Sequence, residues 1–289
     1  MNLPSQQHSI ERAKRQPRKG LFILPSAFTA ANMAAGYYAI SQAVLGGSGG
    51  NYSHFDHAAQ AIGIALVFDF FDGAVARLTN TASAFGRELD SLADVITFGV
   101  APAVLAWMWG FRMLPQTFDP DARARVLQLG GIATFVFLLA GAARLARFNI
   151  QTNPQPSNPG RPGRKYFVGM PIPAGAGAVA AVVHLVRGEP LRWFPLSILW
   201  AMFVFSISFL MVSTWRFSSL KGVNFREQWN FRWLIVLGAL IALIWFASQY
   251  ALFGLALLYI FSGVLARLSF VFRRAPLPHA PPRDEASHA

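Results

Sequence analysis

The sequence predicts an all-α, polytopic membrane helix bundle with about eight transmembrane helices and both termini in the cytoplasm. Hydrophobic residues fill 54% of the 289 positions and charged residues only 13%, roughly half the charged share of an average soluble domain. The apolar residues gather in blocks near the ~20-residue length that crosses a ~30 Å hydrocarbon core. The chain has no Cys, which excludes disulfides, thiolate nucleophiles and Cys-ligated zinc or iron–sulfur sites.

Eight apolar blocks predict the helices, and a basic segment and a polar tail flank them. Residues 1–20 are basic, and the apolar stretch behind them is longer than the core of a cleaved signal peptide, so we expect a retained first helix. The tail at 275–289 is rich in Pro and Ala and has too little apolar surface for a core, so we expect it to be disordered. The expected helices lie near residues 22–45, 58–79, 92–111, 127–149, 168–187, 193–213, 232–249 and 251–272.

The distribution of Lys and Arg orients these helices, because basic residues collect on the cytoplasmic side of a membrane. With the first helix starting in the cytoplasm, 20 of the 25 basic residues lie inside and 5 outside. Eight crossings then return the C-terminus to the cytoplasm. The formal charge of +12 lies beside hydrophobic spans rather than in a soluble domain, so anionic lipids and phosphates are the expected partners and nucleic acid is not.

A set of aspartates with small and basic neighbours begins inside the second expected helix and continues on the third. Offsets of 0, 3, 4, 7 and 8 place its first five members on one helical face. The last two aspartates are one turn apart on the next helix. A short loop sets the two helices side by side, so all four carboxylates can converge at the cytoplasmic side. The members are Asp69, Asp72, Gly73, Ala76, Arg77, Gly86, Asp90 and Asp94.

Converging carboxylates require a cation, because an ionised aspartate in a membrane helix is unfavourable unless it is paired or hydrated. Carboxylates select hard divalent ions, and a site shared with a diphosphate suits Mg²⁺ or Mn²⁺, which bridge protein and phosphate oxygens. Four carboxylates can hold two ions about 4 Å apart, an arrangement used in several phosphoryl transfers. We therefore predict two such ions, with the ligands Asp69, Asp72, Asp90 and Asp94.

The small and basic residues of this set can be interpreted one at a time or as part of the whole pattern. Gly73 and Ala76 lack bulk, which lets a nucleotide ring or a neighbouring helix come close, and Arg77 presents a planar fork of donors that suits a diphosphate. Taken singly, small residues in membrane helices usually serve packing, and an interfacial Arg usually snorkels to water. Taken jointly, eight fixed identities at this spacing arise by chance with a probability on the order of 10⁻⁸.

The pattern Asp-x2-Asp-Gly-x2-Ala-Arg-x8-Gly-x3-Asp-x3-Asp resembles the signature of the CDP-alcohol phosphotransferase family at every fixed position. The resemblance implies metal ligands at Asp69, Asp72, Asp90 and Asp94. It also implies a CDP-binding set formed by Gly73, Ala76, Arg77 and Gly86. Asp94 would in addition serve as general base toward the hydroxyl of an acceptor alcohol, and Arg77 would stabilise charge during the transfer.

Flanking segments resemble one branch of that family, the integral-membrane bacterial phosphatidylserine synthases. This resemblance implies a catalytic core at 21–190 in the bacterial inner membrane, an active site on the cytoplasmic side, and CDP-diacylglycerol and L-serine as substrates. Ser26 stands where the branch commonly has Asn, and the C-terminal transmembrane helices at 191–274 match only in hydrophobicity. The resembling segments are 24–32, 90–103, 144–149 and 169–174.

Arg144 and Arg147, with Asn149 beside them, lie at the inner end of the fourth expected helix. They could bind the carboxylate of serine or a phosphate, or the arginines could only anchor the helix at the cytoplasmic surface. The chemistry of these residues does not identify the acceptor alcohol, because glycerol 3-phosphate, inositol phosphate or choline could replace serine in the same reaction.

Intramembrane aspartates are also typical of transporters, which makes a divalent-cation transporter the alternative to an enzyme. Transporters usually carry such residues on broken helices with repeat symmetry, and this sequence shows no repeat. His54, Asp56 and His57 fall in an expected outer loop, and we interpret them as solvated, whereas isolated His184 is interpreted as structural. Lipid-facing helices could also pair two copies of the chain into a homodimer.

Overall fold

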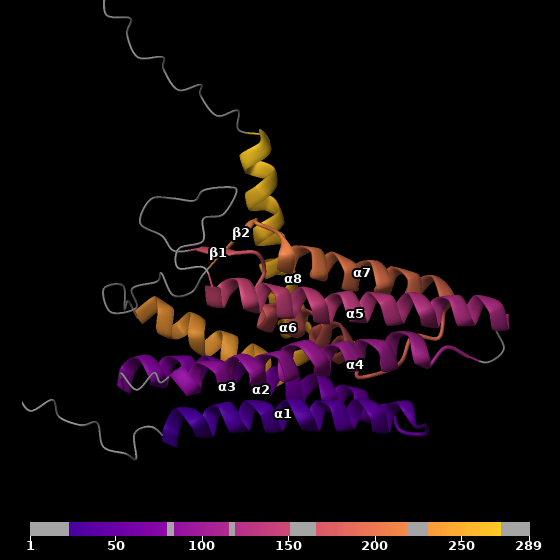
Figure 1. The fold of residues 1–289 in the computed structure, drawn as a ribbon, viewed down its shortest axis with the longest axis horizontal. Helices are drawn as coiled ribbons and strands as arrows, with labels where there is room; N and C mark the ends of the chain where they lie inside the picture. The colour runs from indigo at the N-terminus through magenta and orange to yellow at the C-terminus, as the bar shows by residue number, and fades with distance from the viewer. Residues whose placement is uncertain (1–22, 80–83, 116–118, 151–165, 219–230, 273–289) are drawn as a thin grey trace, which may run out of the picture.

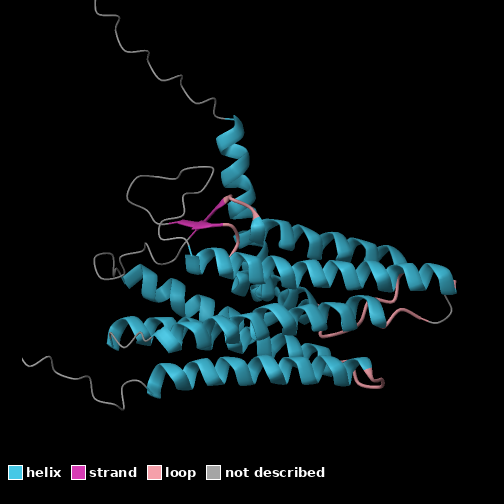
Figure 2. Ribbon diagram, viewed as in Figure 1, coloured by secondary structure: helices cyan, strands magenta, loops and turns pink. Residues whose placement is uncertain are grey.

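The computed structural model describes residues 23–79, 84–115, 119–150, 166–218 and 231–272. Within these ranges the chain is helical apart from two short strands and the connecting loops, which confirms the all-α class (Figure 1, Figure 2). The expected basic segment 1–20 and tail 275–289 lie outside them. In chain order the elements are α1 (Ile23–Gly47), α2 (Ser53–Thr79), α3 (Ala84–Asp94), η2 (Val95–Val100), α4 (Ala101–Trp107), η3 (Met108–Arg112), α5 (Pro120–Ile150), β1 (Tyr166–Val168), α6 (Ile172–Leu185), α7 (Phe194–Val212), β2 (Arg216–Ser218) and α8 (Phe231–Phe272).

The long axes of α1, α4, α5 and α7 run roughly parallel and form the body of the bundle (Figure 1). α1 packs along α2, α5 along α7, and α6 against α2 and α8. Buried alanines such as Ala39, Ala61 and Ala65 occupy the centre of the α1 and α2 helices, where small side chains let helix backbones approach closely. Larger rings, among them Phe98 and Trp109, fill the remaining core.

Five helical stretches among the described residues are long and apolar enough to cross a membrane. They confirm the prediction of an apolar helical bundle with several spans. The predicted number of eight crossings and the cytoplasmic position of both termini stay predictions. α6 is a shorter apolar helix. The five stretches are Ser53–Val75, Phe85–Arg112, Pro120–Ile150, Phe194–Val212 and Ala242–Phe270.

The two helices expected at 232–249 and 251–272 are both present in the structure, as the two halves of the kinked element α8. Its helical path is interrupted at Ala247, where the backbone angles are φ −144° and ψ 46°. Neither Gly nor Pro lies at this kink. The kink therefore divides the 42 residues of α8 close to the boundary that a span length of ~20 apolar residues predicts.

The third expected helix starts at Ala84, well before the expected position 92, because charged residues hide its first two turns from a hydropathy window. Two π-helical segments, η2 and η3, interrupt it, and η2 begins directly after Asp94. Such π turns are frequent at functional sites. α1 packs tightly on η2 at Gly36, where an added Cβ would overlap the backbone of Thr97.

A buried hydrogen-bonded group joins the first turn of α2, the last turn of α6 and the kink of α8. His184 Nδ1 lies 2.5 Å from Asp56 Oδ1, and His184 Nε2 lies 2.9 Å from Ser248 Oγ. Interpreting Asp56 as a solvated loop residue was therefore wrong, since its side chain is only 16% exposed. Hydropathy could not show this pairing, because its members are 64 and 128 positions from His184.

Candidate active site

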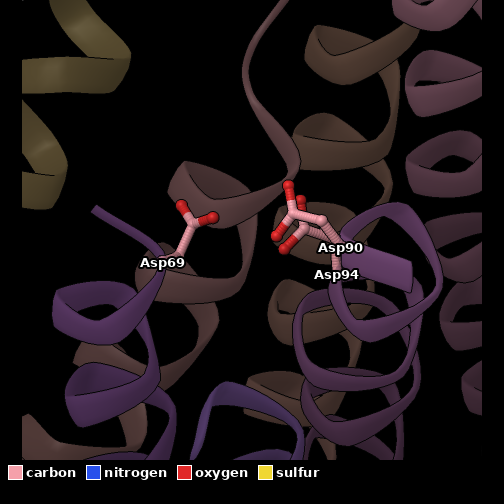
Figure 3. Close-up of side chains that lie close together, drawn as sticks. All are labelled: Asp69, Asp90 and Asp94. Atoms are coloured by element: carbon pink, nitrogen blue, oxygen red, sulfur yellow. The ribbon is translucent and has the colours of Figure 1, made fainter. Parts of the chain in front are cut away.

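Three of the predicted aspartates converge between α2 and α3. Asp69, Asp90 and Asp94 each offer a carboxylate oxygen, and these oxygens lie within 4.8 Å of one another. Figure 3 shows Asp90 and Asp94 side by side on α3, with Asp69 facing them from α2. Asp94 is buried, whereas Asp69 and Asp90 are half-buried. The converging arrangement expected from the spacing is therefore present for these three side chains.

Asp72, the fourth predicted ligand, lies beside this group. Its side chain is buried and accepts a hydrogen bond of 2.5 Å from the Thr29 hydroxyl of α1. Its charge acts on Asp90, as does the charge of Asp69. The structure thus places Asp72 within electrostatic reach of the cluster, while its nearest polar contact is to α1.

Asn32 of α1 holds Asp94 in place. Its Nδ2 donates to Asp94 Oδ1 at 3.4 Å, and its backbone carbonyl accepts a 3.1 Å hydrogen bond from the Thr97 hydroxyl in η2. The role of Thr29 and Asn32 was missed from the sequence. A signal was present, because two polar side chains three positions apart in an uncharged helix lie on one face.

The predicted CDP-binding residues flank the carboxylates. Gly73 is half-buried and directly follows Asp72 on α2, and Gly86 is half-buried on α3, one turn before Asp90. The backbone of α2 continues through Ala76 and Arg77, whose side chains lie outside the described part of the structure. Small residues therefore border the carboxylate cluster on both helices, which leaves room for a ligand close to the backbone.

Arg144 is the member of the predicted acceptor set that lies within electrostatic reach of the carboxylates. The residue is 7% exposed, and its charge interacts with that of Asp94. Its guanidinium lies 5.8 Å from the ring centres of Phe148 and Phe167. Its Nε is buried and has no hydrogen-bond partner among the described residues. A desolvated guanidinium with unused donor capacity, within electrostatic reach of Asp94, suits an anionic group of a ligand.

Arg147 and Asn149 make different contacts. The Arg147 guanidinium donates to the carbonyl oxygens of Val212 at 3.0 Å, Val168 at 3.1 Å and Ser213 at 3.3 Å. These bonds tie α5 to β1 and to the end of α7. The Asn149 amide donates to Ser91 Oγ at 3.0 Å and ties α5 to α3. Both side chains therefore contact protein groups rather than the carboxylate cluster.

Comparison with known proteins places the chain in a family. The model of the CDP-alcohol phosphatidyltransferase family matches residues 22–212, which include all four aspartates, so the chain belongs to this family. A CDP-diacylglycerol–serine O-phosphatidyltransferase of Helicobacter pylori is 33% identical over 255 residues, which cover 86% of this chain and 92% of that protein. Proteins of the same name are 31% identical over 210 residues in Bacillus subtilis (73% of this chain, 98% of that protein) and 39% identical over 124 residues in Methanocaldococcus jannaschii (43% and 49%).

Proposed function

We propose that this protein transfers the phosphatidyl group of CDP-diacylglycerol to L-serine, which yields phosphatidylserine and CMP. The observation that carries the proposal is the buried Arg144 beside the carboxylate cluster, which offers a cation for the acceptor next to the expected base. The names of the relatives support the same acceptor. The active site is assigned to the cytoplasmic side of a bacterial inner membrane, because most basic residues fall on that side.

The carboxylate cluster fits a divalent metal ion. All its donors are oxygens, which suits Mg²⁺ or Mn²⁺. The buried Oδ1 of Asp90 has no hydrogen-bond partner among the described residues, and the charges of Asp69 and Asp72 act on it. Asp69, Asp90 and Asp94 would hold one ion, and Asp72 would contribute to a second. Bound ions would neutralise the diphosphate of the donor and the leaving CMP.

Each of the protein groups has a separate role in the reaction. Asp94, oriented by Asn32, accepts the proton of the serine hydroxyl as its oxygen attacks the β-phosphorus. A bond forms between that oxygen and the phosphorus, and the bond from phosphorus to the bridging oxygen breaks, so CMP leaves with the electron pair. Arg144 binds the serine carboxylate, and Arg77 stabilises the negative charge of the phosphates. Gly73 and Gly86 leave space for the nucleotide.

The test is acceptor-dependent CMP release by the purified protein in detergent micelles that contain CDP-diacylglycerol. We expect release only with L-serine and a divalent ion, and phosphatidylserine as the lipid product. Glycerol 3-phosphate, inositol phosphate and choline serve as competing acceptors in parallel reactions. Equal or faster release with one of them, and none with serine, would reject serine as the acceptor while retaining the family chemistry.

A further inference from the structure

Tyr259, in the second half of α8, brings this helix to the edge of the active site. The phenol and the Arg144 guanidinium interact electrostatically, and Tyr259 is half-buried against the core. Arg144 interacts in turn with Asp94. The carboxylate of Asp94 from α3 and the phenol of Tyr259 from α8 therefore both act electrostatically on Arg144. The family match ends at residue 212, so it includes no residue of α8.

Packing among aromatic rings holds Tyr259 in this position. Its ring stacks on Phe217 of β2, with ring centres 5.7 Å apart and an angle of 30° between the planes. Phe217 is the register partner of Phe167 in the antiparallel β1–β2 pair, and Phe167 lies against Arg144. One turn further along α8, an added Cβ at Gly263 would overlap the Phe217 ring. Arg144 and Tyr259 are thus supported by one continuous packing unit.

The chemistry of this pair is that of an anion site with two kinds of donor. A guanidinium is the usual partner of a carboxylate or phosphate, and its buried Nε has no partner among the described residues. A phenol hydroxyl adds a neutral, directional donor, and a hydrogen bond to a charged group is stronger than one between neutral groups. Two rigidly held donors favour a ligand whose anionic group matches them in position as well as in charge.

We propose that Tyr259 is a specificity-determining residue that donates its hydroxyl to the substrate anion bound by Arg144. The anion is a carboxylate of the acceptor or a phosphate of the lipid donor, which share this chemistry. The inference rests on the proposed function, and it extends the active site beyond the family core to α8. Selection of the substrate then depends on a residue outside the eight-residue pattern of aspartates and their small and basic neighbours.

The test is Tyr259→Phe in the full-length purified protein, because this change removes the hydroxyl and keeps the stacked ring. Tyr250→Phe is the matched control, since Tyr250 lies in the same helix and is 71% exposed. Saturation curves are measured with serine and with CDP-diacylglycerol. We expect Tyr259→Phe to raise one KM by about tenfold, the usual effect of losing one hydrogen bond to a charged group, with kcat little changed. The control should match the parent protein.

The two substrate curves identify the source of the anion. A rise in the KM for serine assigns Tyr259 to the acceptor carboxylate, and a rise in the KM for the lipid assigns it to a phosphate. For the acceptor arm, the ratio of kcat/KM for serine and for ethanolamine, which lacks the carboxylate, should also fall about tenfold. This ratio is insensitive to a partly unfolded fraction, because both acceptors are measured on one preparation.

Two results would overturn the inference. One is a Tyr259→Phe enzyme with both KM values and the acceptor ratio equal to those of Tyr250→Phe. The other is an equal change in all constants together with lower thermal stability, which would indicate a purely structural role. Failure of the proposed function looks different, because the parent protein would then release no CMP with serine.

Discussion

Thr29 and Asn32 donate hydrogen bonds to Asp72 and Asp94 from a helix that carries no charged residue. Neutral donors orient a carboxylate without cancelling its charge, so the aspartates keep their full attraction for a metal ion. A Lys or Arg at either position would compete with the ion for the same oxygens. At the scale of single residues, α1 therefore acts as the support of the carboxylate cluster.

Asn32→Ala should lower activity by 10- to 100-fold, the usual cost of losing a hydrogen bond that orients a metal ligand or base. The loss should appear in kcat and in the divalent-ion concentration that gives half-maximal rate, with the KM for serine little changed. Asn51→Ala, in the exposed turn before α2, is the control. A rise confined to the KM for serine would place Asn32 in the acceptor pocket instead.

Asp90→Asn should abolish transfer, because it removes an anionic oxygen that has no other partner among the described residues. We expect a fall of 10²-fold or more, and EDTA should inactivate the parent enzyme to the same degree. Adding Mn²⁺ or Mg²⁺ after EDTA should restore the parent enzyme only. Asp121→Asn, at an exposed position in the first turn of α5, makes the same substitution away from the cluster. Full activity in EDTA would refute the metal site.

At the scale of helices, the group formed by Asp56, His184 and Ser248 fixes α8 where its helical path breaks. Ala247 departs from helical geometry, and the next residue donates to or accepts from His184. Hydrogen bonding to a neighbouring helix can compensate for a broken helical pattern in an apolar environment. The connection also sets the position of Tyr259, which lies three turns further along the same helix.

Ser248→Ala should lower the free energy of unfolding by about 1–3 kcal/mol, because it leaves a nitrogen of the buried His184 without its partner. Ser206→Ala is the control, since the exposed Ser206 bonds only to a carbonyl of its own helix. The measurement is thermal unfolding in detergent, with Asp56→Asn and the double variant completing a mutant cycle. Additive losses in that cycle would contradict a connected group.

At the scale of the whole molecule, the part of the chain that the structure describes has five apolar stretches long enough to cross a membrane. The split of basic residues in the sequence predicts which end of the bundle is cytoplasmic. The carboxylate cluster is expected at the cytoplasmic end, where water-soluble serine and CMP can enter and leave. We expect the exposed apolar surfaces of the helices to face lipid, which would give the diacylglycerol chains access from the side. The homodimer that such surfaces could form stays a prediction.

Cysteine labelling can measure this orientation directly, because the chain has no native Cys. A cysteine at Ser218, in β2, should react only with reagents that reach the cytoplasm, and one at Ser48, after α1, should react from outside. Labelling in intact cells and in permeabilised cells distinguishes the two. Reaction of both positions from the same side would reject the predicted topology.

Much of the site could be predicted from the sequence, because its main determinants are local. Asp90 and Asp94 share a helix face through the period of 3.6 residues, and a short connection to α2 brings Asp69 opposite them. The composition and the apolar blocks likewise determined the helical membrane class. The family followed from the eight-residue pattern, and the comparison with known proteins confirmed it.

Only the tertiary structure decided which distant residues complete the site. Arg144 and Arg147 are one turn apart on α5, yet Arg144 interacts electrostatically with Asp94 while Arg147 is bonded to three backbone carbonyls. Tyr259 and Arg144 are joined through the pairing of β1 with β2, whose paired residues lie about 50 positions apart in the sequence. The physical reason is that hydropathy and helical period determine which face of a helix is apolar, whereas contacts between helices depend on the packing of the whole bundle.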